Sequence, residues 1–274
     1  MKRIRKAAVA GTFYPASAQE LEQTVRRLLA DVTVRVGPGT VTGIIAPHAG
    51  YMYSGATAAM AYAQLGHTKR SVVVVISPSH REFFDGVSVY PGDGYETPLG
   101  SIPIASGMRE RLTEGVPGIL VSTRGHGLEH ALEVQLPFLQ CALGEFELLP
   151  LVIGNQSQEH CLALGDALGA ICKGTDVLLV ASTDLSHFSS VEAARQLDAV
   201  VAEDIEAFDP VQLMRDLEAG TAEACGGGPV AAVMRGCALL GARTPTVLGQ
   251  SHSGMVTGDN ESVVGYLSAV IQKN

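Results

Sequence analysis

Ser71-Val72-Val73-Val74-Val75-Ile76-Ser77 is the stretch that decides the fold class of this 274-residue chain. Four consecutive valines and an isoleucine make a short apolar run bounded by polar residues, which is typical of a buried strand. β-Branched side chains favour extended backbone because their χ1 rotation is restricted. A strand that is apolar on both sides needs cover on both faces, so the run predicts an interior strand of a sheet that lies between two helical layers.

Similar apolar runs occur elsewhere in the chain and alternate with longer helical patterns. Further strands are expected at 41–46, 148–153, 177–182 and 263–271. Helices are expected at 56–65, 128–143, 158–172, 191–208, 211–217 and 229–240. This alternation predicts an α/β fold with a mostly parallel or mixed central sheet and helices on both faces. Residues 86–104 are rich in Gly and Pro and predict a hairpin-like excursion. No long linker divides the sequence, so residues 1–274 are expected to form a single domain.

Composition excludes several classes of protein. The chain is 46% hydrophobic and only 17% charged, with a net charge of −9, which argues against a nucleic-acid partner. No apolar run approaches the ~20 residues that span a bilayer, and the N-terminus lacks a secretory segment. The five cysteines form no C-x-x-C pair. We therefore expect a cytoplasmic protein with reduced thiols and no membrane association.

Candidate site residues follow the ends of the expected strands. Ligands of open α/β sheets bind at the carboxyl ends of the strands. Three expected strands are each followed shortly by a histidine, and these are His48, His80 and His187. Two imidazoles and one anionic ligand form the site of many non-haem iron proteins. The residues that can supply the anion are Asp184, Glu129, Glu133 and the thiolate of Cys225.

Two segments away from these strands carry further candidates. Cys225 precedes three glycines and an expected helix, whose N-terminus lowers the pKa of a thiol. Glu129 and Glu133 are expected one turn apart on one helix, with His130 beside them as a group that orients a ligand imidazole. No phosphate-binding loop, nucleophile elbow or dinucleotide-binding glycine motif is present.

The ordered motifs resemble those of the Memo family. The motifs are Ala10-Gly11-Thr12-Phe13-Tyr14-Pro15, Ala46-Pro47-His48-Ala49-Gly50-Tyr51, Pro78-Ser79-His80, Glu129-His130 with Glu133, Asp184 with His187, and Cys225-Gly226. The resemblance runs from the N-terminus to Gly265-Tyr266 and covers essentially the whole chain. Each motif is short, but six in the same order are specific.

The resemblance implies a fold similar to that of class III extradiol ring-cleaving dioxygenases of the LigB type. Those enzymes hold Fe(II) with two histidines and a carboxylate, and a further histidine acts as acid and base. Carried onto this sequence, His48 and His80 match the two ligands, and His187, with Asp184 beside it, matches the acid/base. Cys225 falls where the dioxygenases have a carboxylate. A thiolate shifts the metal preference from Fe(II) toward copper or zinc.

Three functions remain open from the sequence. The first is a metal-dependent oxidoreductase that binds iron or copper, with zinc as an alternative, through His48, His80 and Cys225; its support residues are His130, Glu133 and Asp184. The second is a non-catalytic adaptor that binds a peptide or metal ion in the same cleft. The third is a hydrolase or transferase with Cys225 as nucleophile. The aromatic residues expected around the cleft, to contact a small aromatic molecule or a peptide, are Tyr51, Tyr53, Phe83, Phe84 and Tyr95. The resemblance also implies a functional link to radical-SAM and AMMECR-type proteins.

Overall fold

Strands in the computed structural model form one large mixed sheet and one small sheet. The structure describes residues 2–34, 36, 41–66, 69–114 and 116–273. The large sheet contains β2 (Val41–Ala46), β3 (Val72–Pro78), β4 (Val87–Val89), β7 (Ile119–Val121), β8 (Glu147–Ile153), β9 (Val177–Ser182), β10 (His187–Ser189), β11 (Ala242–His252) and β12 (Val263–Lys273). Within the described residues its order is β10-β12-β2-β9-β3-β8-β4-β7, and β11 pairs with β12. The small sheet has the order β1-β5-β6 and contains β1 (Ile4–Arg5), β5 (Gly94–Thr97) and β6 (Gly100–Pro103).

The middle of the large sheet is parallel, and the strands that flank it on either side, β12 and β4, are antiparallel to it. Strands β2, β9, β3 and β8 run in the same direction, and the valine-rich strand β3 lies between β9 and β8. Strand β12 is antiparallel to β2, and β4 is antiparallel to β8. The predicted interior strand and the predicted mixed α/β sheet are therefore confirmed.

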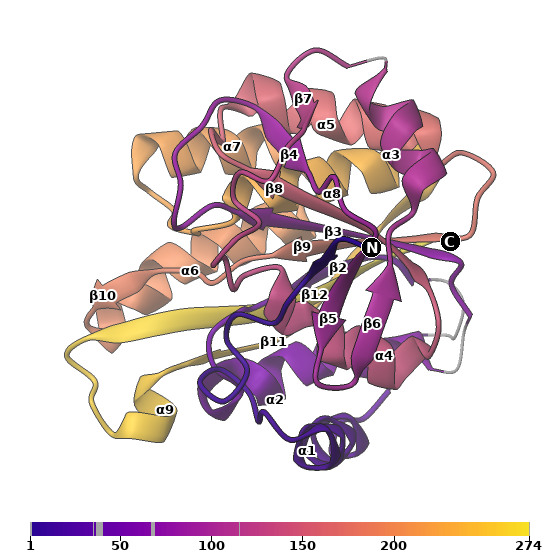
Figure 1. The fold of residues 1–274 in the computed structure, drawn as a ribbon. Coiled ribbons are helices and arrows are strands. Elements are labelled where there is room, and N and C mark those ends of the chain that lie inside the picture. Colours follow the sequence, from indigo (N-terminus) through magenta and orange to yellow (C-terminus); the bar gives the residue numbers. More distant parts are fainter. Residues whose placement is uncertain (1, 35, 37–40, 67–68, 115, 274) are drawn as a thin grey trace.

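Helices cover both faces of this sheet (Figure 1). One face carries α1 (Ala18–Ala30), α2 (Tyr51–Tyr62) and α4 (Leu136–Leu143), together with the small sheet. The other carries α3 (Ser106–Thr113), α5 (Gln158–Ile171), α6 (Val191–Glu206), α7 (Pro210–Ala219) and α8 (Gly227–Leu239). The short helix α9 (Gly254–Thr257) joins β11 to β12, and 3-10 turns lie at Ala63–Leu65 and Glu133–Gln135. None of the described helices has the length and apolar character to cross a membrane.

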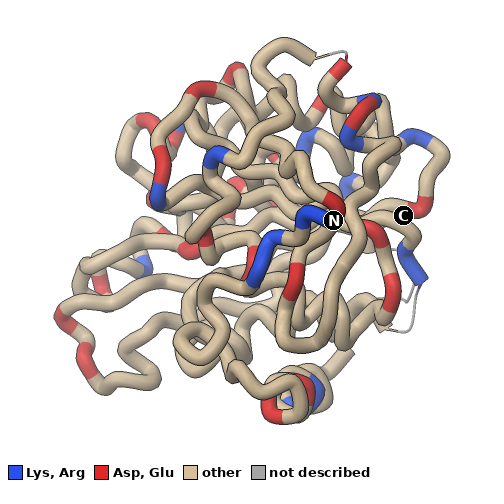
Figure 2. Tube along the Cα trace, in the orientation of Figure 1, with Lys and Arg blue, Asp and Glu red and all other residues tan. Residues whose placement is uncertain are grey.

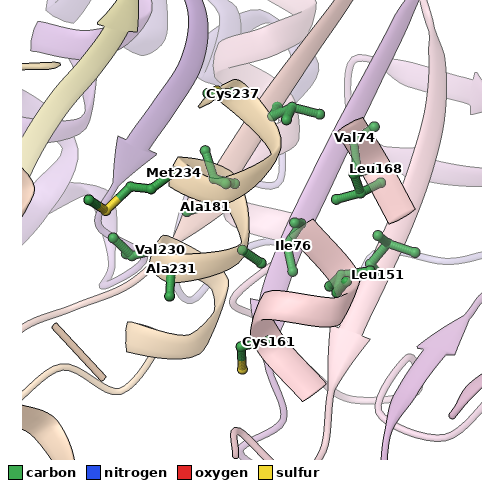
Figure 3. Packing of buried hydrophobic residues seen from close by; sticks show 14 of the residues in the cluster. Val74, Ile76, Leu151, Cys161, Leu168, Ala181, Val230, Ala231, Met234 and Cys237 are labelled. Carbon is green, nitrogen blue, oxygen red and sulfur yellow. The ribbon is translucent and has the colours of Figure 1, made fainter. Parts of the chain in front are cut away.

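The valine run of β3 explains why two cores form. Val74 and Ile76 pack with α5 and α8, as Figure 3 shows, whereas Val73 and Val75 pack on the opposite face with α2. Successive side chains of a strand point to opposite faces, so an uninterrupted apolar run supplies both layers at once. Most charged residues are at least partly exposed, and Lys and Arg are scattered among Asp and Glu along the chain (Figure 2). The charged residues that are buried are Arg5, Glu129, Glu133, Asp184, Asp198 and Asp204.

The predicted helix at 128–143 is only partly correct. Helix α4 begins at Leu136, and residues 128–132 have no regular structure. Pro137 is tolerated in the first turn of α4 but not in a helix interior, which places the start of the helix close to it. Glu129 and Glu133 therefore do not share a helical face, and both are buried.

Strand β11 has no counterpart among the predicted strands. Its sequence includes Pro245 and Gly249, which disguise a strand pattern. Among the described strands it pairs only with β12, so it is an edge strand. A proline is tolerated in an edge strand, because its missing N–H costs no hydrogen bond where no second strand is paired. The excursion at 86–104 is confirmed as the β5–β6 hairpin, except that its first residues form β4 in the large sheet.

Candidate metal centre

Three predicted ligands meet at the carboxyl edge of the parallel strands. His48 follows β2, His80 follows β3, and Cys225 lies just before α8. The Nε2 atom of His48 is 3.2 Å from Sγ of Cys225. One ligand atom from each of the three residues lies within 4.8 Å of the other two. Strand β9 separates β2 from β3, so the loops after these strands converge across its end.

The hydrogen bonds of Ser182 determine the tautomer of His48. The Ser182 hydroxyl donates to the carbonyl oxygen of Ala131 at 2.6 Å, because a carbonyl can only accept. Its oxygen accepts from the side-chain Nε2 of Gln135 at 2.7 Å and contacts Nδ1 of His48 at 2.9 Å. With the hydroxyl proton already committed, Nδ1 of His48 must be the donor. Its Nε2 atom therefore presents a lone pair toward Cys225.

A carboxylate performs the same task for His80. Oε1 of Glu129 is 3.0 Å from Nδ1 of His80, and Oε2 accepts the backbone N–H of His80 at 2.6 Å. Burial acts to raise the pKa of Glu129, but hydrogen bonds from His80 and the Ala131 amide outweigh it and lower the pKa to about 2. An ionised carboxylate only accepts, so His80 carries its proton on Nδ1 and leaves Nε2 free. Carboxylate–histidine pairs of this kind orient imidazole ligands in metal proteins.

A second group, formed by His80, Glu129 and His130, also has donor atoms close enough to hold an ion. The Glu129 carboxylate, however, already accepts hydrogen bonds from His80, from the His130 amide and from the Ala131 amide. Binding an ion there would displace bonds that hold the loop. The group of His48, His80 and Cys225 is therefore the better candidate metal centre.

The backbone around Cys225 brings its thiol against β9. A Cβ at Gly226 would lie 2.2 Å from the carbonyl oxygen of Ser182, so only glycine permits this approach. The Cys225 amide donates to the carbonyl of Asp184, and the Asp184 amide lies 3.3 Å from Sγ. Burial and the nearby Asp184 carboxylate raise the pKa of Cys225. Burial thus outweighs the helix N-terminus from which the sequence predicted a lowered pKa.

Asp184 serves His48 rather than His187. Its Oδ1 atom accepts the backbone N–H of His48 at 2.7 Å, and Oδ2 lies 4.0 Å from Nε2 of the same residue. Burial raises the pKa of Asp184 to about 7, against the opposing effect of hydrogen bonds from the amides of His48 and Ala49. The carboxylate beside His187 is Glu223, which accepts the His187 amide at 3.0 Å and lies 3.8 Å from its Nδ1.

His130 and Glu133, predicted to act together, have different surroundings. The ring of His130 lies 4.9 Å from that of His80 and 5.4 Å from that of His48, and burial lowers its pKa to about 4. Glu133 is engaged by the N-terminal segment instead. It pairs with Arg5 and accepts the Tyr14 hydroxyl and the amides of Ala8 and Val9. His130 therefore lies beside the two candidate ligand histidines, and Glu133 anchors the N-terminal segment.

The predicted aromatic surroundings are only partly correct. Phe83 is 85% exposed, whereas Tyr51, Phe84 and Tyr95 are buried in the core. Phe13 was not expected to contact the site, yet its ring lies 4.7 Å from that of His130. Ser182, Gln135, Glu223 and Arg5 were also missed as support residues. The available signal was the place of Ser182 at the end of an expected strand, of Gln135 next to Glu133 and of Glu223 next to Cys225; Arg5 had no such signal.

Comparisons with known proteins agree with the family resemblance of the sequence. The family model described as Memo-like protein matches residues 5–270. MEMO1 family proteins from Methanosarcina mazei and Aquifex aeolicus are 35% and 36% identical to the chain, over 98% of it and 99% of their own lengths. A crystal structure of an uncharacterized protein from Escherichia coli K12 has a TM-score of 0.56 at 16% identity, covering 83% of this chain and 99% of its own, and shares the fold alone. The family-model match over residues 5–270 and the full-length matches to these relatives show that this chain belongs to the Memo-like protein family.

Proposed function

We propose that the chain binds a transition metal ion, iron or copper or alternatively zinc, through Nε2 of His48, Nε2 of His80 and Sγ of Cys225. The observation that carries this proposal is that hydrogen bonds to Nδ1 leave Nε2 free on both histidines, while one ligand atom from each of the two rings and the thiol lies within 4.8 Å of the others. Two imidazoles and a thiolate suit these ions better than magnesium or calcium. A half-buried thiol of raised pKa, such as that of Cys225, becomes a thiolate when a metal displaces its proton.

The activity that this site supports best is that of a metal-dependent oxidoreductase acting on a small aromatic molecule. A bound metal would supply a Lewis-acid or redox centre for oxygen and a phenolic substrate. His187 has a side chain that is 27% exposed, and Glu223 can hold its Nδ1, so it is suited to take and return a substrate proton. Asp184 holds the backbone of His48, and His130 contributes a neutral imidazole beside the ligands.

A non-catalytic adaptor is the second candidate. Phe83 and Phe188 are 85% and 80% exposed and lie close in sequence to His80 and His187. Exposed aromatic side chains next to a site suit a peptide as well as a substrate. Phe188 also has a φ of 58°, a conformation that is costly for a large side chain.

Elemental analysis of protein purified without oxygen tests the metal proposal. We expect near-stoichiometric iron, copper or zinc in the wild type and its loss in His48→Ala, His80→Ala and Cys225→Ala. Metal-free wild-type protein, even after reconstitution, would refute the metal site. Oxygen uptake with catechols that disappears in His187→Ala while metal is retained would support the oxidoreductase. Tight peptide binding that survives His187→Ala would support the adaptor.

A further inference from the structure

Arg5 is a buried cation that binds one loop from the middle of the chain. Arg5 is in β1 and is only 6% exposed. Nε donates to the carbonyl oxygen of His126 at 2.9 Å, and Nη2 donates to those of Gly127 and Glu129 at 3.2 and 2.6 Å. Nη1 pairs with the Glu133 carboxylate. One guanidinium therefore satisfies three carbonyls within four consecutive residues.

The loop that Arg5 holds is the one that orients His80. Residues 126–129 belong to no strand or helix, so neither a ladder nor a helical turn fixes their backbone. Glu129, the last of them, binds both the backbone N–H and the Nδ1 of His80. A shift of the Glu129 backbone would carry its carboxylate away from His80. Arg5 thus holds the backbone of Glu129, and the carboxylate of Glu129 in turn holds His80.

We propose that Arg5 is a positioning residue for the metal centre. By holding the carbonyls of residues 126–129 it places the Glu129 carboxylate, which turns Nε2 of His80 toward His48 and Cys225. This inference rests on the proposed metal-binding function. The competing explanation is that Arg5 only anchors the N-terminal segment through Glu133. That anchor has other bonds, from the Tyr14 hydroxyl and from the amides of Ala8 and Val9.

The variant Arg5→Lys separates the two explanations. Lysine keeps a positive charge beside Glu133 but lacks the planar fork that reaches several carbonyls at once. We expect Arg5→Lys to remain folded, to bind Co²⁺ about 10- to 100-fold more weakly than the wild type, and to show altered ligand-field absorption. The matched control is Arg109→Lys, because Arg109 also donates to two carbonyls, those of Tyr90 and Gly92, in a different loop. It should retain wild-type affinity.

A double-mutant cycle with Glu129→Gln makes the test specific. If Arg5 acts through Glu129, the loss of Co²⁺ affinity in the double variant should be no greater than in the weaker-binding single variant. Additive losses would overturn the proposal, as would wild-type affinity and spectrum in a folded Arg5→Lys protein. If Arg5→Lys does not fold, Arg5→Gln replaces it in the same cycle.

The positioning claim can also be tested without any metal. In the metal-free protein, ¹⁵N chemical shifts of the His80 imidazole report which nitrogen carries the proton. We expect the Nδ1–H tautomer in the wild type and in Arg109→Lys, and a mixture of tautomers in Arg5→Lys. Failure of the wild type to bind Co²⁺ would refute the proposed function alone. An unchanged His80 tautomer in Arg5→Lys would refute the positioning role.

Discussion

His48 illustrates how a single hydroxyl decides what an imidazole can bind. Its ring is buried, and burial lowers its pKa well below the ordinary value, so the ring is neutral and one nitrogen is free. Ser182 accepts from Nδ1 and thereby directs the lone pair of Nε2 at the site. The side chain that makes the ligand usable is thus not a ligand itself, and it lies at the end of β9, a strand that the sequence predicts.

Replacing Ser182 should weaken metal binding without unfolding the protein. Ser182→Ala removes the acceptor for Nδ1 of His48 and leaves the side-chain Nε2 of Gln135 without one of its hydrogen-bond partners. We expect a 10- to 100-fold loss of Co²⁺ or Zn²⁺ affinity, measured by competition with a chelator. Ser77→Ala is the control, because Ser77 is equally buried on the neighbouring strand β3 and its hydroxyl has no hydrogen-bond partner among the described residues. Equal losses in both variants would contradict the assignment.

The burial of Asp204 predicts a pH dependence of the free energy of unfolding that does not involve the metal centre. It is buried on α6, its Oδ2 atom has no hydrogen-bond partner among the described residues, and burial together with Asp216, Asp209 and Glu203 raises its pKa to about 6. Because its pKa in the unfolded chain is lower, about 3.9, the unfolded state loses this proton first as the pH rises. Asp204 therefore lowers the free energy of unfolding progressively between about pH 4 and pH 7.

The variant Asp204→Asn should remove that dependence. Asparagine resembles the protonated acid, so it should match the wild type near pH 4 and exceed its free energy of unfolding by up to about 3 kcal/mol at pH 7.5. Urea denaturation at several pH values measures the difference. Glu192→Gln, which removes an exposed charge from the same helix, is the control. A difference between Asp204→Asn and the wild type that does not change with pH would contradict the explanation.

At the scale of elements, the sequence predicted strands better than it predicted segments held by tertiary contacts. The apolar runs that become β2, β3, β8 and β9 carry their own signal, and the histidines that follow them were found for that reason. The segment 128–135 is held by Arg5, by N-terminal amides and by His80, all distant in sequence. Its helical spacing was misleading because buried polar contacts with remote partners override local propensity.

The turn before α8 gives a prediction about stability and metal binding together. Gly226→Ala places a Cβ against the carbonyl oxygen of Ser182, so the turn must move. We expect a loss of about 1–3 kcal/mol in the free energy of unfolding and weaker metal binding, because Cys225 moves with the turn. Gly107→Ala, on α3, is the control, since its Cβ would meet no atom within 4 Å. It should be neutral or stabilise the fold by up to about 1 kcal/mol.

At the scale of the whole molecule, sheet order assembles the site. His48, His80 and Cys225 are far apart in sequence but follow or approach three adjacent strands, β2, β9 and β3. The sequence could predict that such loops gather at one edge, because parallel strands share a carboxyl edge. It could not predict that Glu223 rather than Asp184 would serve His187, since that depends on how the turn before α8 packs.

Because the ligands come from separate segments, metal binding should stabilise the whole fold. An ion that binds only the folded chain raises the free energy of unfolding by about 2.7 kcal/mol at 100 times its dissociation constant. We expect added Zn²⁺ to raise the melting temperature of the wild type, measured by calorimetry, and to leave that of the double variant His48→Ala/Cys225→Ala unchanged. An equal shift in both proteins would place the stabilising ion elsewhere.

X-ray absorption spectroscopy of the zinc-loaded protein tests the central claim most directly, because it identifies the atoms bound to the metal. We predict nitrogen scatterers at about 2.0–2.1 Å and a single sulfur scatterer at about 2.3 Å. The sulfur contribution should disappear in Cys225→Ser and persist in Cys141→Ser, whose half-buried thiol lies outside the site. A spectrum with only nitrogen and oxygen scatterers, or one unchanged in Cys225→Ser, would contradict the metal centre formed by His48, His80 and Cys225.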